Sequence, residues 1–114
     1  MATRFEVTHE AGQFLFVLRG ADNSVLLRGL PGDSKIMVQN EILHLRRALG
    51  DPTRVVAHGD GSAHFGVIKD NDGSVLAKSP HLTTREALDE LLATVRKVAV
   101  AAPTIDLAKR ARAG

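Results

Sequence analysis

The sequence matches itself when it is shifted by fifty positions. In that register Val17-Leu18-Arg19 aligns with Val67-Ile68-Lys69, and Ser24-Val25-Leu26 aligns with Ser74-Val75-Leu76. The match continues without a gap through the predicted helical segment that follows in each half. Self-similarity at one fixed offset constrains the fold, because both copies must adopt the same supersecondary unit. The sequence therefore predicts two tandem repeats, at residues 4–50 and 54–100.

Each repeat is expected to contain three short strands followed by one helix. Strand-like runs in the first repeat cover residues 4–8, 14–19 and 24–28, and residues typical of turns separate them. The second repeat has its turn residues at equivalent places. This pattern predicts an α+β, two-layer fold, in which tandem β-β-β-α repeats form an antiparallel meander sheet and both helices pack on one face of it.

The two predicted helices have clear start signals and apolar stripes. The second follows Thr83-Thr84-Arg85-Glu86, which contains a capping box. Its predicted buried face consists of Leu88, Leu91, Leu92, Val95 and Val98. The first begins near Asp33 or Ser34 and ends at Gly50-Asp51-Pro52. Its predicted buried face consists of Val38, Ile42, Leu45 and Leu49, and it has Glu41 where the second helix has Leu91.

Length and composition indicate one packed domain. The chain has 114 residues, of which 44% are hydrophobic and 25% are charged, as is typical of a globular protein with its own core. It contains no cysteine, which excludes disulfides, thiol catalysis and Cys-ligated zinc. We expect a single domain at 1–107, whose segment 103–107 forms a short closing strand, followed by a basic flexible tail at 108–114.

Three segments carry a resemblance to a known family. They are Gly12-Gln13-Phe14-Leu15-Phe16-Val17-Leu18-Arg19, Asn71-Asp72-Gly73-Ser74-Val75-Leu76-Ala77-Lys78-Ser79 and Thr83-Thr84-Arg85. The chain resembles the YegP-like family of small uncharacterised bacterial proteins, in its tandem-repeat form, over roughly residues 4–105. The resemblance implies a two-layer domain with a pseudo-twofold axis between repeats, and no known activity. The second repeat departs from the family pattern at His64 and Gly66, where aromatic residues are expected.

Strand alternation predicts an apolar patch on the side of the sheet away from the helices. If Phe14, Phe16 and Leu18 face the helices, their strand neighbours face outward. The predicted interface residues are Leu15, Val17, Phe65 and Val67. A contiguous apolar patch of this kind favours homodimerisation or binding of another protein. The alternatives are that the C-terminal segment folds over these side chains, or that the two faces are reversed.

The histidines provide one metal hypothesis. His58 and His64 flank a predicted hairpin turn that also contains Asp60. Opposite positions on a hairpin could bring these three side chains around a divalent ion. Their spacing matches no established ligand motif, so exposed hairpin residues without a metal are the favoured interpretation.

Basic residues suggest an alternative function. The isoelectric point is 9.4, yet the excess of cations lies in the last nine residues rather than along a folded face. Weak, sequence-nonspecific nucleic-acid binding would use this tail together with basic pairs near the helix ends. Its candidate residues are Arg46, Arg47, Arg96, Lys97, Lys109, Arg110 and Arg112. The chain has no Trp or Tyr, which removes most of the stacking capacity of a single-strand binder.

Catalytic motifs are not found in the sequence. It contains no nucleophile elbow, phosphate-binding glycine loop or paired-carboxylate arrangement, so we predict no catalytic residue and no cofactor. The N-terminus has no leader pattern and no apolar run is long enough to span a bilayer, so a cytoplasmic location without membrane association is expected. The leading hypothesis is a noncatalytic interaction module that binds itself or another protein.

Overall fold

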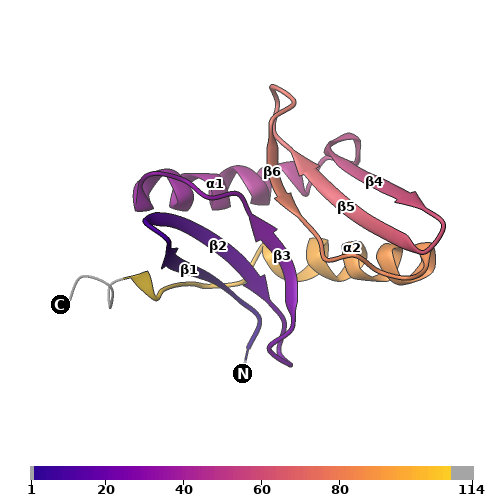
Figure 1. Cartoon of the computed structure of the whole chain (residues 1–114), viewed down its shortest axis with the longest axis horizontal. Coiled ribbons are helices and arrows are strands. Elements are labelled where there is room, and N and C mark those ends of the chain that lie inside the picture. The colour runs from indigo at the N-terminus through magenta and orange to yellow at the C-terminus, as the bar shows by residue number, and fades with distance from the viewer. Residues whose placement is uncertain (1, 109–114) are drawn as a thin grey trace.

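The computed structural model describes residues 2–108 and shows an α+β fold (Figure 1). The strands are β1 (Arg4–Glu10), β2 (Gln13–Arg19), β3 (Val25–Gly29), β4 (Val55–Asp60), β5 (Ala63–Lys69), β6 (Val75–Lys78) and β7 (Thr104–Asp106). The helices are α1 (Lys35–Ala48), the short 3-10 helix η1 (Pro52–Arg54) and α2 (Arg85–Ala99). Three strands and a helix are thus followed by a 3-10 turn, three more strands, a second helix and a last short strand.

All seven strands belong to one sheet with the order β4-β5-β6-β3-β2-β1-β7. Six of them pair antiparallel, as expected, but β7 lies parallel to β1, so the sheet is mixed rather than an antiparallel meander throughout. The chain returns from α2 to this edge, where the Phe5 amide donates to the Pro103 carbonyl at 2.8 Å and the Leu107 amide donates to the Val7 carbonyl at 2.9 Å. The predicted closing strand is confirmed.

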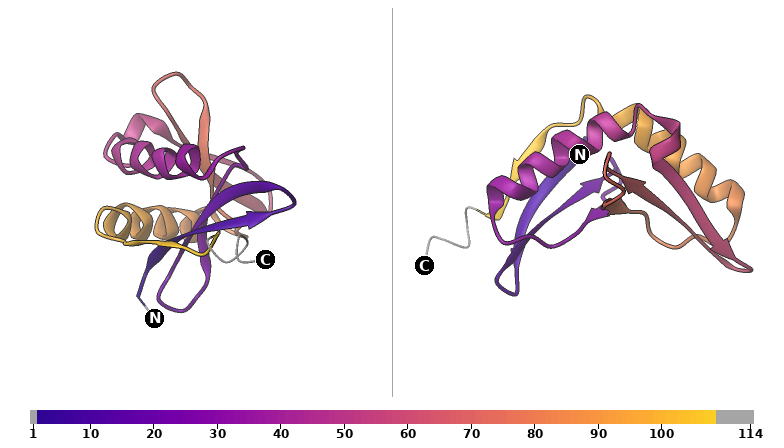
Figure 2. Two further views of the ribbon diagram at one scale, coloured as in Figure 1. Left: turned by 90° about the vertical axis from the view of Figure 1, so that its left-hand side faces the viewer. Right: turned by 90° about the horizontal axis from the view of Figure 1, so that it is seen from above.

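The two hairpin-containing halves of the sheet meet at the β3–β6 pair. Arg28 lies directly opposite Lys78, and Gly29 lies opposite Ala77. Both helices lie on the same side of the strands, whereas hairpins β1–β2 and β4–β5 diverge on the other side (Figure 2). We call the side of the sheet away from the helices the outer face. The β3–β6 pair therefore runs along the middle of this face.

Both helices begin close to the predicted positions. Ser34 caps α1 by accepting a hydrogen bond from the Met37 amide at 3.1 Å. Thr84 caps α2 by accepting one from the Ala87 amide at 3.1 Å, so the cap lies one residue after the Thr83 that the capping-box pattern favoured. Neither helix within residues 2–108 is long and apolar enough to cross a membrane.

The core lies between the helices and the sheet. Its fully buried side chains include Phe5, Phe16, Leu18, Ile42, Leu45, Ile68, Leu88 and Val95. The predicted stripes are confirmed: all four residues of the first helix are buried, and in the second Leu88, Leu92 and Val95 are buried while Leu91 and Val98 pack against the cluster partly exposed. Burying side chains of this size contributes about 1.5–3 kcal/mol each.

Candidate functional site

The outer face has a row of six residues that runs across the sheet. In strand order from β1 to β4 the row is Glu6, Val17, Arg28, Lys78, Val67 and Val56. The two cations at its centre are exposed and stand opposite each other on antiparallel strands. Like charges in directly opposite positions destabilise a sheet. The side chains of Arg28 and Lys78 make no hydrogen bond or ion pair with any other residue in the described part of the chain.

A hollow of about 380 Å³ lies over these two cations. Its walls come from the start of β3 and from the loops that follow β3 and β6, with apolar contributions from Val25, Leu30, Pro31 and Pro80. Leu30 is 40% exposed. Proline fixes the backbone torsion φ, so these walls lose little conformational freedom when a ligand binds. The hollow therefore combines an apolar rim with two unpaired positive charges.

Glu6, the one acidic residue of the row, belongs to an ion-pair network on β1 and β2. Glu6 accepts from Arg4 Nε at 2.9 Å and from Arg19 Nε at 2.8 Å. Arg4 is only 4% exposed and also donates to the Asn23 side chain. Glu6 makes no ion pair with Arg28, which lies two strands away in the row with Val17 between them.

The predicted apolar patch is not open to solvent. Leu15, Val17 and Val67 point away from the helices as expected, but they are only 6%, 5% and 4% exposed. In the pairing register Val17 stands between Glu6 and Arg28, and Val67 stands beside Lys78. Long charged side chains commonly bury their aliphatic stems along neighbouring apolar surface. The exposure expected for these three residues was therefore wrong, although their orientation was right.

Phe65, the fourth predicted interface residue, remains half-buried on the outer face. It is stacked between two imidazoles, with ring centroids 5.3 Å from His58 and 4.9 Å from His81. Both histidines are exposed. Phe65 lies two residues from Val67 along β5, so this stack flanks the Lys78 side of the row. It extends the apolar surface beyond the hollow.

The structure does not bring the proposed metal ligands together. His58 pairs with Phe65, whereas His64 pairs with Gly59, so the two imidazoles project from opposite faces of the hairpin. His64 Nε2 lies 3.0 Å from the Gly61 carbonyl oxygen. The side chain of Asp60 is outside the described part of the structure. Within that described part, no group of three potential ligands could hold a metal ion.

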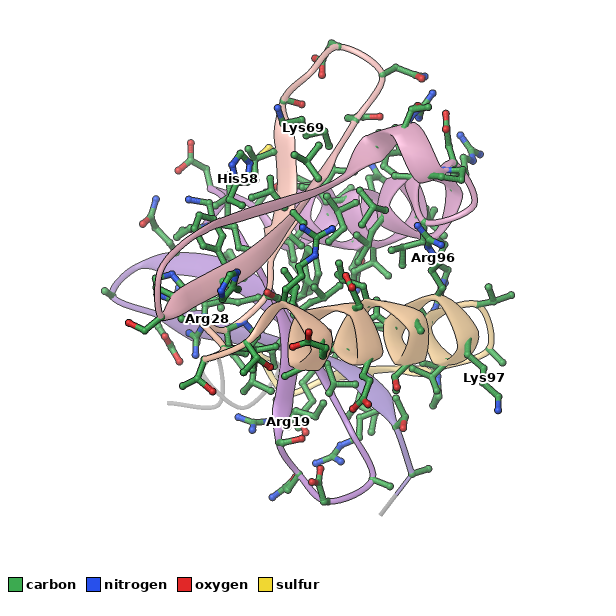
Figure 3. The ribbon with its side chains drawn as sticks, turned by 90° about the vertical axis from the view of Figure 1, so that its right-hand side faces the viewer. Arg19, Arg28, His58, Lys69, Arg96 and Lys97 are labelled. Carbon is green, nitrogen blue, oxygen red and sulfur yellow. The ribbon has the colours of Figure 1, made fainter. Side chains whose placement is uncertain are left out.

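The predicted nucleic-acid residues occupy another side of the molecule. Figure 3 shows Arg96 and Lys97 on the side opposite Arg28 and His58. Arg46 is committed to the fold, since it donates to the Ala99 carbonyl at 3.2 Å and the Ala102 carbonyl at 2.7 Å and lies over the Phe5 ring. Arg47 is exposed. Lys109, Arg110 and Arg112 lie outside the described residues.

A second hollow also contains basic residues, but acidic residues line it as well. It has a volume of about 260 Å³ and is lined by His44, Arg47, Arg54 and Asp70, among others. Two of its basic residues have acidic neighbours, since His44 lies 3.3 Å from Asp70 and Arg54 lies 3.3 Å from Asp51. The outer hollow has no acidic residue in its lining, and it is therefore the stronger candidate for binding an external group.

Acidic residues at the strand turns serve the backbone. Hydrogen bonds from the Ser24 side chain and amide hold the pKa of Asp22 below its ordinary value, and Ser74 does the same for the pKa of Asp72. Both carboxylates are thereby fixed as turn-forming acceptors at the β2–β3 and β5–β6 connections. They are not arranged as catalytic acids or bases.

Sequence reasoning did not single out Arg28 and Lys78, the two cations at the centre of the row. The signal was present in the self-alignment, because positions 28 and 78 are fifty residues apart and both basic. What was lacking was the pairing of β3 with β6, which turns two equivalent positions into direct neighbours. Charges on separate strands become a site only once the strand order is known.

Comparison with known proteins identifies the fold but no activity. No protein-family model matches the sequence, and no curated protein matches it. The chain is similar in structure to the UPF0339 protein SO3888 of Shewanella oneidensis, with a TM-score of 0.89 at 18% identity over 98% of this chain and 97% of that one. It is also similar to YegP of E. coli, a protein of unknown function, with a TM-score of 0.86 at 19% identity over 95% of each chain. The fold is thus of the YegP type.

Proposed function

We propose that this chain is a noncatalytic protein-binding module and that its partner binds at the outer hollow. The observation that carries the proposal is the combination of apolar walls, Leu30, Pro31 and Pro80 among them, with two cations that have no partner in residues 2–108. Phe65 and its stacked histidines extend the same surface. Arginine and phenylalanine are among the residue types that are enriched at protein interfaces.

Charge favours a different protein over a second copy of this chain. In a twofold dimer formed through the outer face, the same patch meets itself. Arg28 and Lys78 of one copy would then face the same two cations of the other, without an acidic residue in the hollow to separate them. A partner with negative charge avoids this repulsion, so we expect the isolated protein to be monomeric in dilute solution.

We also propose that the two halves are tandem β-β-β-α copies, that helices and sheet form the two layers of the domain, and that a pseudo-twofold axis through the Arg28–Lys78 pair relates the copies. In support, these two residues are fifty positions apart and directly opposite. The loop bridges support it as well, since Phe14 pairs with Gly32 and His64 pairs with Leu82. On this proposal the hollow lies on the axis, and one loop from each copy forms a wall.

The test is recovery of partners by the full chain on a solid support, with and without nuclease, compared with solution mass by light scattering. Leu30→Asp should abolish recovery of a specific partner, because it places a charge in the apolar wall. Ile36→Asp is the matched control, since Ile36 is 71% exposed on α1. If both variants recover the same proteins as the wild type, the outer face is not the binding surface.

Nucleic-acid binding remains the second candidate, carried by the exposed Arg47, Arg96 and Lys97 on the helix side. It predicts that recovery is lost on nuclease treatment and that affinity falls steeply with salt. Deleting residues 109–114 should then reduce the salt slope. Loss of recovery with nuclease but not with Leu30→Asp would favour this candidate over the outer face.

A further inference from the structure

We infer that Arg28 and Lys78 form a carboxylate-binding site, which recognises an acidic side chain flanked by apolar residues on the partner protein. This inference rests on the proposed function and names the chemistry that the outer hollow selects. Three observations carry it: the direct opposition of the two cations, their lack of internal partners, and the apolar walls around them.

The opposition of the two cations is difficult to explain by stability. Val17 and Val67 flank the pair in the register, and the next charged residue in the row, Glu6, is held by Arg4 and Arg19. An acidic residue at either position would pair with its neighbour and stabilise the β3–β6 junction. The sequence instead has a cation at both positions, and an external anion is the group that would relieve their repulsion.

The geometry suits one carboxylate. Opposite residues on antiparallel strands have Cβ atoms about 4.5–5.5 Å apart, so a guanidinium and an ammonium can converge on the two oxygens of a single group. Val25, Leu30 and Pro80 line the hollow beside the cations. When apolar groups of a partner pack on them, water is excluded and the charged hydrogen bond is strengthened. The same walls disfavour a small, fully hydrated anion and favour an anion that carries apolar neighbours.

The inference makes stability and binding respond in opposite directions to one substitution. Lys78→Glu creates an opposite-charge pair with Arg28 across β3 and β6, so the variant should unfold at a higher urea concentration than the wild type. The same substitution replaces half of the anion site with a carboxylate and should abolish binding of an acidic probe. Lys97→Glu has the same change in net charge on the exposed, opposite side of the molecule and is the matched control.

Binding is measured by NMR titration of the labelled full chain with three probes: acetyl-Leu-Glu-Leu-amide, its Gln analogue and inorganic phosphate. We expect the Glu peptide to shift the amide signals of Arg28, Gly29, Lys78 and Ser79, and the Gln analogue to bind about tenfold more weakly. Arg28→Gln should weaken binding of the Glu peptide by a similar factor, and Lys97→Glu should leave that binding unchanged.

Three results would overturn the inference. Equal binding of the Glu and Gln peptides would mean that the hollow recognises apolar groups alone. Saturable shifts with phosphate but none with the Glu peptide would indicate a phosphate-bearing ligand. No shift at these amides with any probe would mean that the pair is not an anion site. The inference can fail while the proposed function holds: if Leu30→Asp removes partner recovery and Lys78→Glu does not, the outer face binds a partner without this carboxylate contact. If neither variant affects recovery, the proposed function itself is wrong.

Discussion

In the first half of the sheet the outer face carries the Arg4–Glu6–Arg19 network, whereas the positions fifty residues later hold Arg54, Val56 and Lys69. The helix side differs too: the first half has Phe16 packed over Gly29, and the second has Gly66 beside Ser79. The strand pairings are nevertheless the same in both halves. The same backbone arrangement therefore accepts two different sets of side chains that contact one another, provided that the side chains of each set change together.

The largest expected loss of stability comes from giving position 6 the valine that the second half has at position 56. Glu6→Val leaves Arg4, which is 4% exposed, without its carboxylate. Removing one partner of a buried pair typically costs about 3–5 kcal/mol, because an uncompensated charge stays buried. Urea unfolding should show a loss of about 3 kcal/mol in the free energy of unfolding.

A double variant separates the charge effect from the loss of side-chain volume. Arg4→Met combined with Glu6→Val removes both charges, so the double variant should be more stable than the Glu6→Val variant. The Arg4→Met variant is measured as well. If the double variant loses as much free energy of unfolding as the two single variants lose together, Arg4 and Glu6 do not depend on each other and the network is not a unit.

The next effect concerns close packing on the helix side. A Cβ atom at Gly29 would lie 2.3 Å from the Phe16 ring, whereas Ser79 has room because Gly66 takes the place of that ring. Ser79 also accepts a hydrogen bond from the Gly66 amide at 2.8 Å. Gly29→Ser should therefore destabilise the protein by about 2–3 kcal/mol through overpacking.

Two controls test whether the clash with Phe16 is the cause. Ser79→Gly removes the hydrogen bonds of the hydroxyl with the Gly66 amide and the Pro80 carbonyl, without a clash, and should cost about 1–3 kcal/mol whether or not Phe16 is present. In a Phe16→Ala background the additional cost of Gly29→Ser should fall, because the ring that it meets is gone. An unchanged cost in that background would point to the backbone of β3 rather than to the ring.

These two contrasts show what the sequence could and could not predict. The departures at His64 and Gly66 were visible from the offset of fifty, as were the strands, the helix stripes and the outward direction of Leu15 and Val17. That Ser79 compensates for Gly66 was not visible, because the two residues meet only through the β5–β6 register. Burial of Val17 and Val67 was missed for the same reason, since their long-chain neighbours Arg28 and Lys78 belong to other strands.

A smaller effect is expected where α1 has Glu41 in place of Leu91 on α2. Burial raises the pKa of Glu41 above its ordinary value of 4.5, while His44 opposes the shift. Between the ordinary and the raised pKa the native state binds more protons than the unfolded state, so this residue makes stability fall as pH rises through that window. Glu41→Gln should remove this component of the pH dependence.

The measurement is urea unfolding of wild type and Glu41→Gln from pH 4 to pH 7, with the difference plotted against pH. The turn carboxylates titrate equally in both proteins, so they cancel in the difference. At neutral pH Glu41→Leu should also be more stable than wild type, by about 1 kcal/mol, because the apolar stripe is completed. A difference that does not change with pH would mean that Glu41 is fully hydrated.

The smallest expected effect concerns β1, on the outer face of the first half. Thr8 stands opposite Leu15, and its hydroxyl is the one buried side-chain polar atom that has no hydrogen-bond partner in residues 2–108. At the equivalent position the second half has His58, which is exposed and stacks on Phe65. Thr8→Val keeps the shape and removes the unsatisfied hydroxyl, so it should raise the free energy of unfolding by about 0.5–1 kcal/mol. Thr8→Ser keeps the hydroxyl, loses the methyl group and should lower it. If Thr8→Val is the less stable of the two, the hydroxyl must be hydrogen-bonded in solution, and the contrast between an internally closed first half and a solvent-facing second half would not extend to this strand.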